Sequence, residues 1–126
     1  MGTPRVLVVE DNPVNMELVA ALLENEHCRV LSAETADVSL RLAAAERPDL
    51  ILMDIQLPGM SGHDATRRLK ADPVTAGIPV VALTAHAMLG EEARAREAGF
   101  DAFLTKPIDT QAFRDTLWRF LGNTRC

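Results

Sequence analysis

The chain has 126 residues, of which 48% are hydrophobic and 25% are charged, a composition typical of one soluble globular domain. Its apolar runs are far shorter than the ~20 residues needed to cross a bilayer, and no secretory signal opens it. The net charge of −5 disfavours a broad nucleic-acid surface, which needs Lys and Arg to neutralise phosphates. We therefore expect a single cytoplasmic domain over residues 1–126, with a core at about 5–121 and no direct binding to DNA or membranes.

Short apolar runs alternate along the chain with segments of helical periodicity. The runs predict buried strands at 6–9, 30–31 (a weaker run), 50–53, 80–83 and 102–104. Helical spacing of apolar residues follows, as in Val14, Leu18 and Leu22 near the start. Because strands of this kind separated by helices form parallel sheets covered on both faces, the sequence predicts an α/β fold. The expected architecture is a (βα)₅ doubly wound five-stranded parallel sheet.

Local sequence features predict the start of one helix, the end of another, and the state of the cysteines and of two histidines. Asn12 before Pro13 is typical of a helix start, and Gly99 is typical of a helix end. The two cysteines, Cys28 and Cys126, have neither disulfide-framework nor metal-ligand spacing, so both are expected to be free thiols. His27 and His63 are expected at the surface.

Polar residues stand at the carboxyl ends of four predicted strands, where open α/β sheets bind their ligands. They are Glu10 and Asp11 after the first strand, Asp54 after the third, Thr84 after the fourth and Lys106 after the fifth. Three carboxylates held this close raise one another's pKa unless a cation compensates them. Mg²⁺ prefers such oxygen ligands, whereas zinc would need His or Cys, so the sequence predicts a magnesium site.

The same residues suit covalent phosphoryl transfer to a carboxylate. Asp54 would accept the phosphoryl group, and the Lys106 ammonium and Thr84 hydroxyl would contact its oxygens. The small side chain of Ala85 would leave room for the group. Each residue alone has a structural alternative, such as helix capping by Glu10. Their coincidence at successive strand ends favours the site.

Four ordered motifs make the chain resemble the receiver domain of bacterial two-component response regulators, from Val6 to about Leu121. The motifs are VLVVEDN at 6–12, LMDIQLPGMSG at 52–62, PVVALTA at 79–85 and LTKP at 104–107. The resemblance implies a flavodoxin-like, CheY-like receiver fold and a phosphorylation-activated switch of a two-component or phosphorelay system. The chain looks similar both to stand-alone (DivK-like) receivers and to receivers of hybrid histidine kinases.

The resemblance also implies a role for each residue of the acidic site. Asp54 would be the phosphoacceptor and a ligand of Mg²⁺, with Mn²⁺ as an alternative ion. Asp11 would bind the metal directly and Glu10 through water. Gln56 would supply its backbone carbonyl to the metal. The bond between Lys106 and Pro107 is expected to be cis.

Four positions affect switching or the lifetime of the phosphoryl group in the family that the chain resembles. Thr84 would move toward the phosphoryl group and allow Phe103 to turn inward, although Phe103 has an equal alternative as a core aromatic. Gln56 and His86 occupy the variable positions that tune how fast water removes the phosphoryl group. His86 is expected at the rim of the pocket.

The implied partners are a sensor histidine kinase or a histidine phosphotransfer protein as the donor, and a downstream protein as the target. We expect a monomer that is not an enzyme but assists its own phosphorylation and dephosphorylation. A binding module independent of phosphorylation is disfavoured, because no acidic residue of the motif is lost. An aspartate-based phosphohydrolase would need a second Asp where Gln56 stands, and a flavin protein would need a Gly-rich loop after the first strand.

Overall fold

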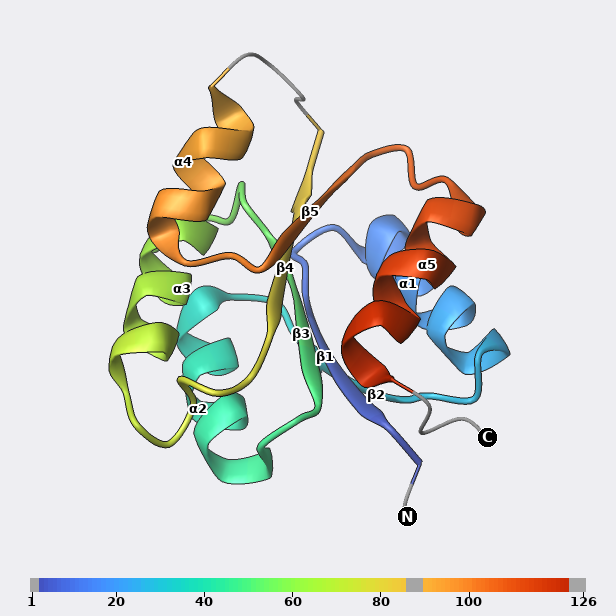
Figure 1. The fold of residues 1–126 in the computed structure, drawn as a ribbon, viewed down its shortest axis with the longest axis horizontal. Helices are drawn as coiled ribbons and strands as arrows, with labels where there is room; N and C mark the ends of the chain where they lie inside the picture. Colours follow the sequence, from blue (N-terminus) through green and yellow to red (C-terminus); the bar gives the residue numbers. More distant parts are fainter. Residues whose placement is uncertain (1–2, 86–89, 123–126) are drawn as a thin grey trace.

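The computed structural model describes residues 3–85 and 90–122, in which strands and helices alternate along the chain (Figure 1). The strands are β1 (Arg5–Val9), β2 (Arg29–Ala33), β3 (Leu50–Asp54), β4 (Val80–Thr84) and β5 (Ala102–Thr105). The helices are α1 (Pro13–Asn25), α2 (Ala36–Glu46), α3 (Gly62–Ala71), α4 (Glu91–Ala98) and α5 (Thr110–Leu121). The predicted strand positions and the (βα)₅ order are confirmed.

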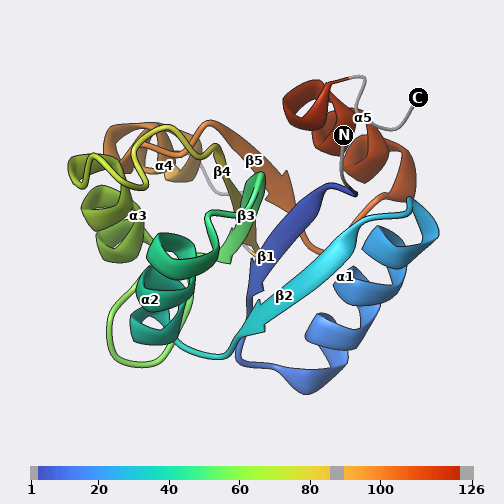
Figure 2. The ribbon, with the colours of Figure 1, turned by 90° about the horizontal axis from the view of Figure 1, so that it is seen from below.

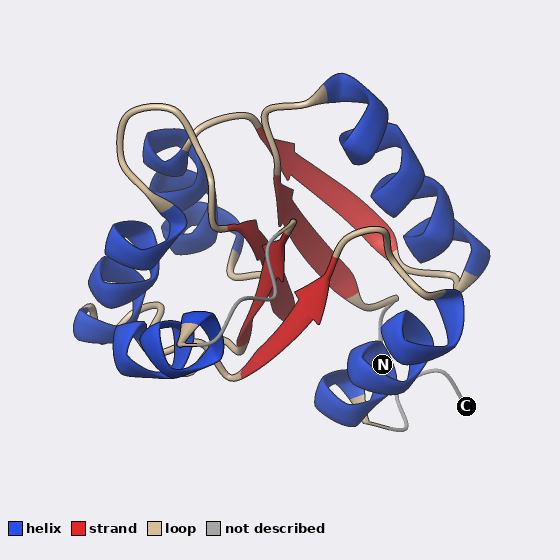
Figure 3. Ribbon diagram, turned by 90° about the horizontal axis from the view of Figure 1, so that it is seen from above, coloured by secondary structure: helices blue, strands red, loops and turns tan. Residues whose placement is uncertain are grey.

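The strands form one parallel sheet in the order β2-β1-β3-β4-β5. Helices α1 and α5 cover one face, and α2, α3 and α4 cover the other (Figures 2 and 3). The chain order reverses between β1 and β3, which pair with Val9 opposite Met53. Ligands of such sheets bind beyond the carboxyl ends of the strands at this switch point. The fold thus brings the residues that follow β1 and β3 side by side.

Two apolar clusters hold the helices on the sheet, one on each face. Alternate residues of a strand enter opposite clusters, so Leu7 and Val9 lie under α2–α4 whereas Val6 and Val8 lie under α1 and α5. Every residue of β3 and β4 is buried, which explains their continuous apolar runs. The edge strand β2 is only half-buried, which explains why its apolar signal is weak.

The capping signals behave as the sequence predicts. The Asn12 side chain accepts hydrogen bonds from two backbone N–H groups of the first turn of α1, and Gly99 ends α4 with a left-handed backbone. Cys28 is a free and buried thiol, and Cys126 lies outside the described residues. In the described part of the chain, each helix is too short or too polar to span a membrane.

One of the two surface predictions for histidines is wrong. His27 is exposed, but His63 is only partly exposed and its Nε2 atom is buried. The ring of His63 meets Phe100 edge to face, with 5.8 Å between the ring centroids. The sequence signal was misleading because His63 follows Ser-Gly in a polar stretch, whereas the helix turns this position toward α4.

Candidate functional site

The residues that follow β1 and end β3 form an acidic cluster at the carboxyl edge of the sheet. Glu10 is 1% exposed and Asp54 is 5% exposed, whereas Asp11 is exposed to solvent. One carboxylate oxygen from each of these three residues lies within 4.8 Å of the other two. The fold therefore brings together the three acidic residues that the sequence singled out.

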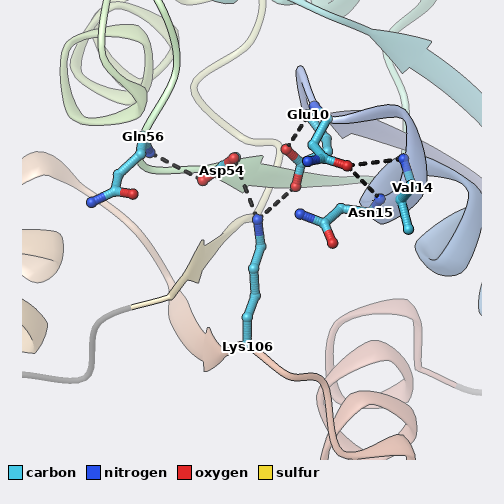
Figure 4. Close-up of polar contacts among 7 residues, drawn as sticks. Glu10, Val14, Asn15, Asp54, Gln56 and Lys106 are labelled. Carbon is cyan, nitrogen blue, oxygen red and sulfur yellow. Dashed lines mark hydrogen bonds and ion pairs between the residues drawn. The ribbon is translucent and has the colours of Figure 1, made fainter.

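Backbone hydrogen bonds fix the two buried carboxylates. The Glu10 N–H donates to the carbonyl of Ala33 and extends the β1–β2 pairing, and the Asn12 N–H donates to Glu10 Oε2 at 3.2 Å. The Gln56 N–H donates to Asp54 Oδ1 at 3.0 Å (Figure 4). One oxygen of each carboxylate is thus held by the backbone, while the other faces the centre of the site.

Lys106 joins the two buried carboxylates (Figure 4). Its Nζ atom lies 2.6 Å from Glu10 Oε1 and 3.4 Å from Asp54 Oδ2. The Lys106 N–H donates to the carbonyl of Thr84 at 2.7 Å, which ties the end of β5 to the end of β4. The Lys106–Pro107 peptide bond is cis. Thr84 is buried at the same edge, and Ala85 after it is exposed.

The ionisation of the site reflects an excess of buried negative charge. Burial raises the pKa of Asp54 to about 6, with the neighbouring Glu10 acting in the same direction and the Gln56 N–H opposing it. Burial also acts to raise the pKa of Glu10, but hydrogen bonding, first of all from Lys106, outweighs it and lowers that pKa. Burial acts to lower the pKa of Lys106, and the bond to Glu10 with the charge of Asp54 raises it. One ammonium serves two carboxylates.

This donor set fits a hard divalent cation. Carboxylate oxygens from Glu10, Asp11 and Asp54 converge within 4.8 Å, and Mg²⁺ takes oxygen ligands of this kind at about 2.0–2.1 Å. The compensation by Lys106 is incomplete, so a cation would offset the burial and the proximity of Glu10 that raise the pKa of Asp54. Among the described residues, no His or Cys belongs to the cluster.

Gly62 positions the segment between β3 and α3 in a way that we did not predict. A Cβ atom on Gly62 would lie 2.4 Å from the carbonyl oxygen of Asp54 and 2.9 Å from the Cα of Ile55. The Gly62 N–H donates to the Ile55 carbonyl at 3.1 Å. Only glycine allows α3 to begin this close to the backbone of Asp54. The signal was the glycine of the LMDIQLPGMSG motif, but the sequence does not reveal the distance.

The remaining predicted positions lie farther from the carboxylates. Phe103 is partly buried on β5 and packs against the core under α2–α4. It lines a cavity of about 220 Å³ together with Phe100, Arg96 of α4 and Arg119 of α5. Gln56 is exposed beside Asp54, and His86 lies outside the described residues.

Comparisons with known proteins agree on one family. The model of the family described as the response regulator receiver domain matches residues 6–117. The chain is similar to the polar-differentiation response regulator DivK of Brucella anthropi, with 44% identity over 118 residues, covering 94% of this chain and 96% of that protein. The DivK of Brucella ovis is 43% identical over 121 residues, covering 96% of this chain and 98% of its own.

Solved structures share the fold. The receiver domain of the sensor histidine kinase PA1611 of Pseudomonas aeruginosa, with a magnesium ion coordinated in its active-site cleft, has a TM-score of 0.89 and 35% identity, covering 96% of this chain and 99% of that one. The Saccharomyces cerevisiae receiver domain of Ssk1, crystallised with the histidine phosphotransfer protein Ypd1, has a TM-score of 0.84 and 25% identity, covering 94% and 88%.

Proposed function

The chain belongs to the response regulator receiver domain family, and from this membership we propose that it accepts a phosphoryl group on Asp54. It is a signalling switch of a two-component system. The observation that supports Asp54 is its place at the end of β3, almost fully buried, with its carboxylate 3.4 Å from the Lys106 ammonium and near the carboxylates of Glu10 and Asp11. Asp11 and Glu10, which follow β1, are ligands of the metal in the proposal.

The proposed cation is Mg²⁺, held by Asp11 and Asp54 directly, by Glu10 through water and by the backbone carbonyl of Gln56. A bound Mg²⁺ would neutralise developing negative charge on the phosphoryl oxygens. Support for this ion comes from the three convergent carboxylates and from the magnesium in the cleft of the similar Pseudomonas receiver. Mn²⁺ is the alternative ion, because it takes similar oxygen ligands.

The transfer that we propose is a displacement at phosphorus. A carboxylate oxygen of Asp54 attacks the phosphoryl group of a phosphohistidine, and an O–P bond forms as the P–N bond breaks. The electron pair of the broken bond returns to the donor imidazole. Lys106 neutralises one phosphoryl oxygen, the Thr84 hydroxyl donates a hydrogen bond to another, and the small Ala85 leaves the space that the group needs.

Lys106 must change partners for this step. Lys106 lies closer to Glu10 than to Asp54, so its ammonium has to leave Glu10 to contact a phosphoryl oxygen. Movement of Thr84 at the end of β4 would be transmitted to Phe103 on the neighbouring strand β5. Phe103 pairs in register with Ala82 of β4. We propose that this reshapes the cavity between α4, β5 and α5, and that a downstream protein reads the change.

The donor in the proposal is a sensor histidine kinase or a histidine phosphotransfer protein, by analogy with the similar yeast receiver bound to Ypd1. We further propose that the chain folds as one domain with a core at about 5–121, acts as a cytoplasmic monomer and does not bind DNA. We also propose that it assists its own phosphorylation and dephosphorylation without being a turnover enzyme, with Gln56 and His86 tuning the loss of the phosphoryl group.

Intact-mass spectrometry after incubation with acetyl phosphate tests the acceptor. We expect the wild-type chain to gain one phosphoryl group in the presence of Mg²⁺, and Asp54→Asn to gain none. Asp115→Asn, which changes an exposed carboxylate of α5, is the matched control and should behave as the wild type. Asp11→Asn should need a higher concentration of Mg²⁺ to reach the same extent of phosphorylation. Lys106→Ala should still bind Mg²⁺ but give a weaker switching response.

Two outcomes would contradict the proposal. Phosphorylation of Asp54→Asn at the wild-type level would place the acceptor elsewhere. If the wild type gains nothing from acetyl phosphate, a phosphorylated histidine phosphotransfer protein is the second donor. Failure with that donor as well would leave a receiver fold that functions only by binding.

A further inference from the structure

Helix α3 presents two buried polar atoms without partners to helix α4. Among the described residues, neither His63 Nε2 nor Thr66 Oγ1 has a hydrogen-bond partner, so the two atoms do not bond each other either. The residues lie one helical turn apart and therefore share a face of α3. The His63 ring contacts Phe100, and a Cβ atom built on Gly99 would lie 3.8 Å from the methyl group of Thr66. Both thus face the end of α4.

The charged groups around His63 come from both helices. On α3, Arg67 pairs with Asp64 at 3.0 Å, and on α4, Arg94 lies 3.7 Å from Glu91. These four groups all act on the imidazole electrostatically. Asp64 and Glu91 are each already paired with an arginine, so neither carboxylate is a dedicated partner of His63. A proton added at Nε2 would create a buried N–H donor at an atom that has no hydrogen-bond partner among the described residues.

We propose that His63 makes the contact between α3 and α4 sensitive to protons, because the neutral imidazole fits this contact and the imidazolium does not. The histidine would be an acid sensor at a position separate from Asp54. It would act on α4, the helix that supplies Arg96 to the wall of the cavity beside Phe103. Acidification would then loosen this helix without any phosphoryl group.

The direction of the effect follows from the environment of the ring. Burial, followed by the charge of Arg94, lowers the pKa of His63, and the opposing effects of Glu91 and Asp64 do not cancel this. In the unfolded chain a histidine titrates at about 6.5. The contact is therefore fully stable above that pH and loses stability as the pH falls through the folded-state pKa of His63.

Hydrogen exchange of α4 tests the proposal on the whole chain. Exchange of residues 91–98 is measured at pH 7.5 and pH 5.5 by mass spectrometry and corrected for the intrinsic effect of pH on exchange. The variants are His63→Leu and the control His27→Asn, which removes an exposed histidine. We expect a several-fold faster opening of α4 at pH 5.5 in the wild type and in His27→Asn, and no acceleration in His63→Leu. Titration of Asp54 is common to all three chains and cancels in the comparison.

A direct titration keeps the proposal testable if His63→Leu does not fold. The Cε1–H signal of His63 is followed by NMR in the wild-type chain and assigned with His63→Gln. A pKa clearly below 6.5, together with faster opening of α4 at pH 5.5, supports the proposal. Titration at 6.5 or above would overturn it. Equal acceleration in the wild type and in His63→Leu, or no acceleration in either, would overturn it as well.

Discussion

The carboxylates of Glu10 and Asp54 at the strand ends and the carboxylate of Glu26 are all buried, but their partners differ. At the strand ends, Glu10 and Asp54 share the single ammonium of Lys106. Between α1 and α5, Glu26 has two donors to itself. Trp118 Nε1 donates to its Oε1 at 2.9 Å, and Arg114 Nε lies 3.1 Å from its Oε2.

This difference separates a stabilising contact from a binding site. A buried charge with full compensation holds two elements together, and removing it is costly. The two buried carboxylates of Glu10 and Asp54 share one cation and repel each other. Burial and the proximity of Glu10 raise the pKa of Asp54 to about 6. The unmet charge is what a divalent cation would satisfy. Substitutions in the two regions should therefore change stability in opposite directions.

The largest effect is expected for Glu26→Ala. The substitution leaves the indole N–H of Trp118 without this carboxylate acceptor and removes a polar contact between the end of α1 and α5, so the free energy of unfolding should fall by about 2–3 kcal/mol. Urea unfolding followed by the fluorescence of the single tryptophan measures it. Glu24→Ala, an exposed position on the same helix, is the control. Equal losses in both variants would show that the Glu26 contacts contribute nothing specific.

The opposite sign is expected for Asp54→Asn in the absence of Mg²⁺. The folded-state pKa of Asp54 is about 6, against 3.8 for the free residue, so its charged form costs stability above that pH. At pH 7.5 the substitution should raise the free energy of unfolding by about 1–2 kcal/mol. The gain should shrink at pH 5, where the wild-type carboxyl is protonated. A loss of stability at pH 7.5 would mean that Asp54 is as well compensated as Glu26.

Stabilisation of the wild type by Mg²⁺ should depend on pH. At a concentration about ten times its Kd, the ion should add about 1.4 kcal/mol to the free energy of unfolding at pH 7.5. Protons compete for Asp54 as the pH falls through about 6, so the gain should be smaller at pH 5. Thermal unfolding at both pH values, with and without Mg²⁺, measures the difference. A gain independent of pH would exclude Asp54 as a ligand.

The sequence predicted the acidic region far better than the contact of Glu26 with Trp118 and Arg114, and the reason is geometric. Parallel strands end at one edge of a sheet, so residues after apolar runs can be placed together without any distance being known. No comparable rule joins Glu26, which caps the end of α1, to Trp118 of α5, 92 positions farther along the chain. Their contact depends on how α1 and α5 pack, and periodicity does not specify that packing.

Within the acidic region, the sequence predicted which residues meet but not how they share charge. The preference of Lys106 for Glu10 over Asp54 depends on distances of 2.6 and 3.4 Å, which no motif encodes. The burial of His63 was missed for a related reason. A lone histidine in a polar stretch shows no periodicity, whereas its contact with Phe100 arises only once α3 and α4 are packed.

The smallest effect is expected at His27, the residue after Glu26, where a substitution should stabilise the region that is already well compensated. His27 has a left-handed backbone with φ of 63° at the end of α1, where its N–H donates to the Glu24 carbonyl. Glycine adopts this conformation without the cost of a Cβ atom. His27→Gly should therefore raise the free energy of unfolding by about 0.5 kcal/mol, the relief of strain being partly offset by the greater freedom of the unfolded chain. In urea unfolding, His27→Ala, which keeps the Cβ atom, should show no gain. Equal effects of the two substitutions would attribute the change to the imidazole and not to the backbone.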